Sequence, residues 1–166
     1  WRVFARNRLA LIGLGIVLAL VLIAAFADQI APYSAYTGDL RTTCTHLKSG
    51  NHFETDAPTD NNGKGERFSP TDLLATSLAA CMITVMGIKA RTMGFDLDDV
   101  KIEVLKLMKS DPRRVGGIEL IFHIPERLAA LEEKTRIILK NTGETCPVIK
   151  SIHPEIEVKV DWGSWS

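Results

Sequence analysis

Residues 69–93 read SPTDLLATSLAACMITVMGIKARTM and predict a long helix. Ser69 is a good N-cap residue, and Pro70 suits the first helical position. No further glycine or proline follows until Gly87, and apolar residues surround almost the whole circumference of the helix. A helix that is apolar all round is expected to be buried inside a folded body. Cys81 at its centre is therefore either inert filling or a protected nucleophile.

Cys146 has a different setting. It follows a helix that we expect to end at Gly143, and it precedes Pro147, which can start a new helix. Its sulfur is thus expected near free backbone N–H groups, which favour a thiolate. Cys81 lies about twelve residues into its own helix, where the helix dipole has faded, so its activation needs a basic side chain from elsewhere.

The chain contains five short motifs: YTGDLR at 36–41, SPTDL at 69–73, SLAACM at 77–82, PRR at 112–114 and TCPV at 145–148. Together they resemble the OsmC/Ohr family of thiol-dependent peroxidases. The resemblance covers about residues 36–162. It implies an OsmC-like fold, with antiparallel sheets around a long buried central helix, in an intimate homodimer. It also implies that Cys81 attacks an organic hydroperoxide and becomes a sulfenic acid, which Cys146 resolves as a disulfide.

Two positions depart from the pattern of the best-studied members of that family. Their central helix begins with Asn-Pro-Glu, and the glutamate helps hold an arginine against the reactive thiol; here Thr71 stands at the position of the glutamate. The arginine comes from the loop after the first strand, where this chain has Lys48. Lysine cannot supply the bidentate fork of arginine. Lys48, the nearby Arg41 and Thr71 are therefore the candidates for supporting Cys81.

The composition limits the function classes. The chain has 166 residues, 46% of them hydrophobic, which suits one globular domain and an additional segment. The formal net charge of zero gives no indication of nucleic-acid binding. Three cysteines, an odd number, argue against a secreted disulfide framework.

The additional segment is at the N-terminus. Residues 9–27 carry no charge and are long enough to span a bilayer, with arginines before them and Asp28 after them. The arginines predict a cytoplasmic N-terminus. One alternative is a secretory signal cleaved after Ala25-Phe26-Ala27. The other is a permease segment, because residues 1–33 resemble the N-terminus of permease subunits of oligopeptide and dipeptide ABC transporters. We favour the permease segment, because that resemblance continues beyond the cleavage point.

We therefore divide the chain into a permease-like transmembrane segment, residues 1–34, and an OsmC-like redox domain, residues 35–166. The join is abrupt, and we interpret it as an accidental fusion. The redox domain is then expected in the cytoplasm, and it is membrane-anchored only if the N-terminal segment is genuine.

The remaining elements predict an α+β fold with a largely antiparallel sheet. Between the elements, Ser110–Gly117 is expected to form a hairpin loop. The alternation of Val100, Ile102, Val104, Leu105 and Leu107 indicates a strand. The expected strands are residues 39–46, 52–55, 100–108, 118–124 and 155–162, and the expected helices beyond the central one are 126–141 and 147–152.

The prediction for function is a thiol-dependent peroxidase that acts on organic hydroperoxides. Leu78, Met82 and Met86 are expected to line its apolar pocket. The thiols need no cofactor or metal, and the resemblance implies a dithiol reductant such as a lipoylated protein. One alternative is a domain of the same fold that binds a hydrophobic ligand without catalysis. A further alternative is a fragment of a transporter permease.

Overall fold

The computed structural model describes residues 12–18, 21 and 33–166. It contains two compact units, Trp1–Ser69 and Pro70–Ser166, and each is described by itself. The domain boundary that we predict at residues 34 and 35 falls inside a strand of the first unit. Most of the predicted transmembrane segment, residues 9–27, lies outside the described residues; residues 12–18 are helical.

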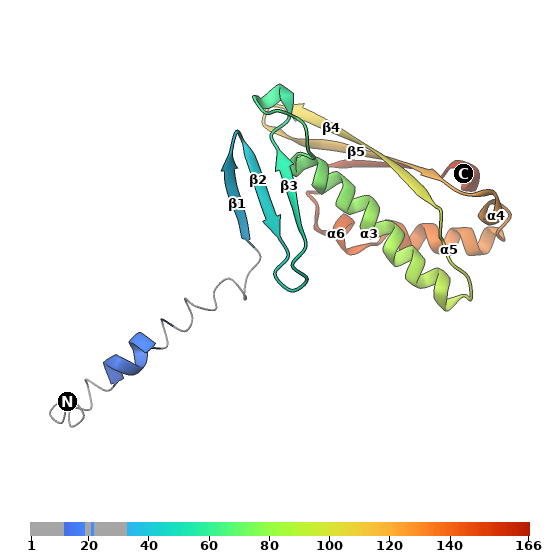
Figure 1. Cartoon of the computed structure of the whole chain (residues 1–166). Helices are drawn as coiled ribbons and strands as arrows, with labels where there is room; N and C mark the ends of the chain where they lie inside the picture. The colour runs from blue at the N-terminus through green and yellow to red at the C-terminus, as the bar shows by residue number, and fades with distance from the viewer. Residues whose placement is uncertain (1–11, 19–20, 22–32) are drawn as a thin grey trace. The chain divides into compact units, whose positions relative to one another are not determined.

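The first unit contains a three-stranded antiparallel sheet in the order β1-β2-β3, seen in Figure 1. β1 was not expected from the sequence, and β2 begins two residues later than predicted. The reason is the hairpin turn at Asp39 and Leu40, whose φ angles of 51° and 57° are in the left-handed region that leucine rarely adopts. The strands are β1 Tyr33–Gly38, β2 Arg41–Thr45 and β3 His52–Asp56, followed by the 3-10 turn η1 Thr59–Asn61.

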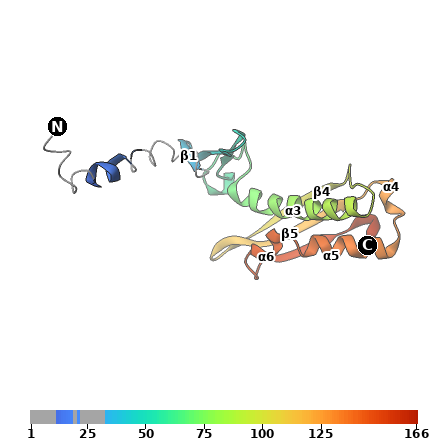
Figure 2. The same ribbon diagram turned by 90° about the horizontal axis from the view of Figure 1, so that it is seen from below.

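The second unit packs helices α3 and α5 on one face of a sheet of order β4-β5-β6 (Figures 1 and 2). β4 and β5 are antiparallel, whereas β5 and β6 are parallel. The α+β prediction is confirmed, with this one parallel pair in an otherwise antiparallel arrangement. The elements are α3 Pro70–Thr92, β4 Lys101–Ser110, β5 Arg113–His123, α4 Glu126–Ala129, α5 Glu133–Glu144, α6 Pro147–Ser151, β6 Glu157–Asp161 and the 3-10 turn η2 Gly163–Trp165.

Helix α3 is buried along one face only. Within a single chain, α3 is therefore not enclosed on all sides. On the opposite face Leu74 is 37% exposed and Ile88 is 62% exposed. Among the described residues, α3 is the only helix long and apolar enough to cross a membrane, a property that a core helix of a soluble protein shares. The fully buried side chains that α3, β5 and α5 contribute to the core are Leu78, Met82, Met86, Ile118, Leu120, Phe122 and Leu139.

The inward face of β4 carries only some of the apolar residues whose alternation indicated the strand. Leu105 and Leu107 point outward and are 53% and 41% exposed. The residues on the helix-covered face alternate with these two leucines along the strand, and one of them is a lysine. These less exposed residues are Ile102, Val104, Lys106 and Met108.

The predicted hairpin loop 110–117 is also shorter than expected. Only Asp111 and Pro112 form the turn, and the strand pairing continues from Arg113. Gly117, which suggested a loop, lies in β5. A side chain at this position would press on Leu107 and on the backbone of Glu157, so the glycine serves close packing and not a turn.

The predicted helix 126–141 is interrupted. α4 ends at Ala129 and α5 begins at Glu133. Gly143 does not end the second helix, as predicted, but lies inside α5 and is buried. The short helix predicted at residues 147–152 is confirmed as α6.

Candidate active site

Two cysteines from distant parts of the chain meet in the second unit. Cys81 is in the middle of α3 and is partly exposed. Cys146 is the N-cap residue of α6 and is 1% exposed. The two side chains are hydrogen-bonded to each other, and both are free thiols. A partly exposed thiol therefore has a second, protected thiol within reach.

The surroundings of Cys146 act on its thiol in opposite directions. Burial raises the pKa of the Cys146 thiol, whereas the backbone N–H groups of Ile149 and Val148 donate to the sulfur and lower the pKa. The predicted N–H groups are thus present, but burial outweighs them and the pKa is raised overall. The expectation that Cys146 favours a thiolate is wrong, because the helix terminus that supplies the donors also removes the sulfur from water.

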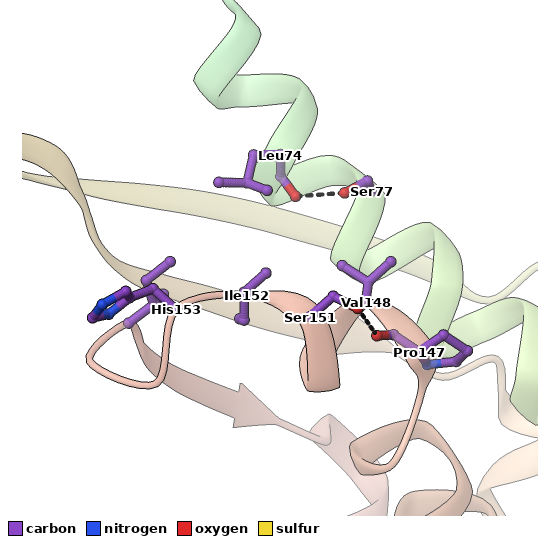
Figure 3. A pocket seen from close by; sticks show the side chains of 8 residues that line it. Leu74, Ser77, Pro147, Val148, Ser151, Ile152 and His153 are labelled. Carbon is purple, nitrogen blue, oxygen red and sulfur yellow. Dashed lines mark hydrogen bonds between the residues drawn. The ribbon is translucent and has the colours of Figure 1, made fainter.

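A groove of about 520 Å³ lies between α3 and the segment that begins with α6, and its lining includes sequence neighbours of both cysteines (Figure 3). Ser77, on its α3 wall, is one helical turn before Cys81, and Pro147, on its α6 wall, directly follows Cys146. The hydroxyl groups of Ser77 and Ser151 donate to carbonyl groups of their own helices, Leu74 O at 2.7 Å and Pro147 O at 2.9 Å. The groove therefore presents a mainly apolar surface. Its lining residues are Leu74, Ser77, Pro147, Val148, Ser151, Ile152, His153 and Ile156.

The apolar side chains that we expected in the pocket are elsewhere. Leu78, Met82 and Met86 are fully buried on the core side of α3 and do not line this groove. The circumference of α3 is so uniformly apolar that the sequence does not distinguish its core side from its open side. Leu74 and the residues after Cys146 form the apolar wall instead.

Thr71 has a partner that the sequence did not indicate. The ammonium group of Lys106 donates to Thr71 Oγ1 at 2.9 Å and pairs with the Asp72 carboxylate at 2.6 Å. Lys106 is on β4, and its side chain is 16% exposed. The available signal was the alternation of β4, which places this lysine on the core face between Val104 and Met108. The first turn of α3 is thus held by a lysine of the sheet.

The basic candidates of the first unit have their own surroundings. The guanidinium of Arg41 forms two hydrogen bonds with the buried Asp56 carboxylate, at 2.6 and 2.8 Å, and a third with Glu66 at 2.8 Å. These carboxylates raise the pKa of Arg41, and the Arg41 guanidinium in turn holds the pKa of Asp56 below its ordinary value. Lys48 is exposed in a turn. A supporting role of Arg41, Lys48 or Thr71 at Cys81 stays a prediction.

The described residues contain no group of three or more His, Cys, Asp or Glu side chains that could hold a metal ion.

Comparison with known families separates two parts of the chain. A family model of OsmC-like proteins matches residues 63–161, which is more than half of the chain. The chain belongs to the OsmC-like family. A second model, the N-terminal TM domain of oligopeptide transport permease C, matches residues 1–48. Both resemblances predicted from the sequence are thereby confirmed. A search of curated proteins found no match.

Solved structures agree with the OsmC-like assignment. A protein from Psychrobacter arcticus 273-4, whose name refers to osmotic stress and a detoxification response, is 53% identical, with a TM-score of 0.74. The alignment covers 78% of this chain and 93% of that protein. The organic hydroperoxide resistance protein OsmC of Legionella pneumophila is 20% identical, with a TM-score of 0.60 and coverage of 79% and 95%.

The organic hydroperoxide resistance protein OhrB of Bacillus subtilis is 18% identical, with a TM-score of 0.53 and coverage of 80% and 97%. The OsmC of Legionella and the OhrB of Bacillus have the same fold as this OsmC-like chain. At these identities the similarity concerns the fold alone.

Proposed function

We propose that this OsmC-like protein is a thiol-dependent peroxidase that reduces organic hydroperoxides. The observation that carries the proposal is the hydrogen-bonded pair of free thiols, Cys81 and Cys146, beside an apolar groove. A peroxide needs an accessible thiol to attack, and the sulfenic acid formed needs a second thiol to protect it from further oxidation. The partly exposed Cys81 suits the first role, and the buried Cys146 suits the second.

The reaction has two steps. In the first, the thiolate of Cys81 attacks the outer peroxide oxygen, the O–O bond breaks, and the alkoxide takes up a proton and leaves as the alcohol. Cys81 is thereby oxidised to a sulfenic acid. In the second, the Cys146 sulfur attacks the Cys81 sulfur, an S–S bond forms, and the hydroxyl group leaves as water. A dithiol then reduces the disulfide and is itself oxidised.

The N–H groups of Val148 and Ile149 support the second step. They donate to the Cys146 sulfur in the resting state. Since the same donors stabilise negative charge, they favour the thiolate at the moment when this sulfur attacks. Burial keeps Cys146 as a neutral thiol until then, which reserves attack on the peroxide for Cys81.

The groove supports the substrate class. Its mainly apolar wall favours the hydrocarbon part of an organic hydroperoxide over the small, polar hydrogen peroxide. Two proteins with the same fold, from Legionella pneumophila and Bacillus subtilis, are named for organic hydroperoxide resistance. We extend their named role to this chain as part of the proposal, with a dithiol such as a lipoylated protein as the reductant.

The open face of α3 supports a homodimer. Ile88 is 62% exposed on this face, and nothing lies within 4 Å of the place that a Cβ atom of Gly87 would occupy. A second copy could approach closely at Gly87 and cover the apolar side chains. The OsmC-like domain is proposed to be cytoplasmic, with residues 9–27 as a membrane anchor if the N-terminal segment is genuine.

The test uses the reduced chain and one equivalent of cumene hydroperoxide. We expect rapid formation of a Cys81–Cys146 disulfide, detected by mass spectrometry of peptides under non-reducing conditions. Cys81→Ser should abolish consumption of the peroxide, whereas Cys146→Ser should accumulate a sulfenic acid that dimedone traps. Cys44→Ser is the matched control and should behave like the unchanged chain. If both thiols stay reduced, the catalytic proposal is wrong.

That last result would favour the second candidate, a non-catalytic domain that binds a hydrophobic ligand. The apolar groove favours this candidate as well, and so does the engagement of Thr71 by Lys106 at the position of the family glutamate. Binding of an apolar ligand by the Cys81→Ser variant, without any peroxide chemistry in the unchanged chain, would then identify the function.

A further inference from the structure

The groove beside the thiols has a polar donor at one end only. His153 lies at the end remote from Pro147, and the other lining side chains are apolar groups and two serines satisfied by their own helices (Figure 3). The backbone N–H of Glu155 donates to His153 Nδ1 at 3.2 Å. A neutral imidazole held in this way carries its proton on Nε2, so Nε2–H is available as a donor.

The charges near His153 suit a ligand with a negative end. Glu155, the closest carboxylate along the chain, is paired with the guanidinium of Arg114 from β5. This ion pair fixes the segment that carries His153 and neutralises the carboxylate. The exposed Lys150 of α6 adds a positive charge three residues before His153. At this end of the groove, a ligand oxygen can therefore accept a hydrogen bond from His153 Nε2–H. The Glu155 carboxylate repels it less, because that carboxylate is paired with Arg114.

The lining residues nearest to the cysteines in sequence are Ser77 and Pro147. Cys146 directly precedes Pro147, and Cys81 is one turn beyond Ser77 on α3. From Pro147 to His153 the chain runs through α6 and two further residues. This path corresponds to a separation of at most about 14 Å, from the rise per residue of helix and extended chain. A ligand that spans the groove from Pro147 to His153 is therefore at most about 14 Å long, with one end next to the segment that carries Cys146 and the other at His153.

We propose that His153 is a specificity-determining residue, whose Nε2–H binds an oxygen acceptor such as a carboxylate at the far end of an apolar substrate that reacts at Cys81. This inference rests on the proposed function for its substrate, an organic hydroperoxide, but the site itself is built from the groove and the histidine. It predicts that the groove selects among organic hydroperoxides by the group at their far end.

The experiment labels Cys81 in the full chain with two alkylating reagents of the same length. Each carries a bromoacetamide group on a straight eight-carbon chain, which ends either in a carboxylate or in an ammonium group. The second-order rate of Cys81 alkylation is measured for each by peptide mass spectrometry. We expect the carboxylate reagent to react faster, because the ammonium end cannot accept a hydrogen bond from His153.

Three variants test the residue. His153→Leu should lower the ratio of the two rates by about three- to tenfold, the effect of one hydrogen bond. His153→Gln keeps a donor and should restore most of the ratio. His123→Leu is the matched control, because His123 pairs with Glu103 outside the groove. A ratio of one in the unchanged chain, a ratio that His153→Leu leaves unchanged, or a failure of His153→Gln to restore it would overturn the proposal.

The labelling distinguishes this proposal from the proposed function. Bromoacetamide itself, which has no chain, reports the reactivity of Cys81 in every variant. If hydroperoxide forms no disulfide but the reagents still discriminate through His153, the peroxidase proposal fails and the specificity site stands. If the disulfide forms and His153→Leu has no effect on either the ratio or the KM for a carboxylate-bearing hydroperoxide, the reverse holds.

Discussion

Gly143 of α5 packs against Met86 of α3 so closely that a Cβ atom at Gly143 would lie 2.9 Å from the Met86 sulfur. Met86 is fully buried, so its side chain has little room to move. Gly143 is three residues before Cys146. The close contact between the two helices therefore lies near the end of α5, within one turn of the segment that carries Cys146.

We expect Gly143→Ala to destabilise the protein. Overpacking costs about 1–3 kcal/mol, and the better helix propensity of alanine offsets about 1 kcal/mol of that loss. Gly87→Ala is the matched control, since Gly87 is also helical but has no group within 4 Å of a Cβ. It should gain up to about 1 kcal/mol. Urea unfolding measures both, and equal stabilisation by the two substitutions would contradict the close contact.

The two thiols should differ in reactivity with pH. Burial raises the pKa of the Cys146 thiol above its ordinary value of 9.0, so this thiol stays protonated at neutral pH. We expect iodoacetamide to alkylate the partly exposed Cys81 first, and Cys146 to react only as the pH rises above about 9, where the thiolate begins to form. Differential alkylation between pH 6 and 10 measures this, with the urea-unfolded chain as the reference. Preferential alkylation of Cys146 at pH 7 would show that the sulfur is not protected.

Lys106 should stabilise the start of α3. Lys106→Met leaves the Asp72 carboxylate and the Thr71 hydroxyl without this ammonium group, and we expect a loss of about 1–3 kcal/mol in the free energy of unfolding. A double-mutant cycle with Asp72→Asn separates the pairwise contribution from other effects. Strictly additive losses would show that the pair contributes nothing. Cys81 is more than two turns beyond Asp72 on α3, so the peroxidase rate below the melting temperature should change little.

The ion pair of Arg41 and Asp56 should make the free energy of unfolding depend on pH in the acidic range. Arg41 holds the pKa of Asp56 below its ordinary value of 3.8, so the folded state binds fewer protons than the unfolded state in this range. The stability that the pair contributes is fully present above pH 3.8 and is lost as the pH falls through the lowered pKa. Asp56→Asn should lower stability at pH 7 and weaken its dependence on pH below 4. Urea unfolding at pH 7, 5 and 3 checks this, and an unchanged acid dependence in the variant would contradict it.

Several elements followed directly from local sequence. The central helix begins at Pro70, as its capping residues predicted, and the short helix after Cys146 begins at Pro147. Predictions failed at glycines, because glycine occurs both at turns and helix ends and at positions where two segments pack closely. Gly143 and Gly117 resembled stop and turn signals, but the absence of a side chain serves close packing at both positions. The turn at Asp39 and Leu40 was not predicted for the opposite reason, because leucine gives no signal for the left-handed conformation that it adopts here.

The candidate site was predictable in its parts and not in its arrangement. The family motifs singled out Cys81 and Cys146 as a pair. The groove, the raised pKa of Cys146 and the position of His153 were not visible, since each depends on residues from both α3 and the segment after α5. Lys106 was missed because the strand was recognised from its apolar residues alone, which include the outward-facing Leu105 and Leu107.

By itself, the sequence determined the helical and β-strand periodicities, the family motifs, the two candidate cysteines and the unrelated N-terminal segment. These are properties of neighbouring residues, which capping, alternation and composition record directly. Only the tertiary structure decided which face of α3 is open, which cysteine is buried, and what binds Thr71 and Asp72. These properties arise from contacts between distant segments, and a helix as uniformly apolar as α3 does not encode in its own pattern which side its neighbours cover.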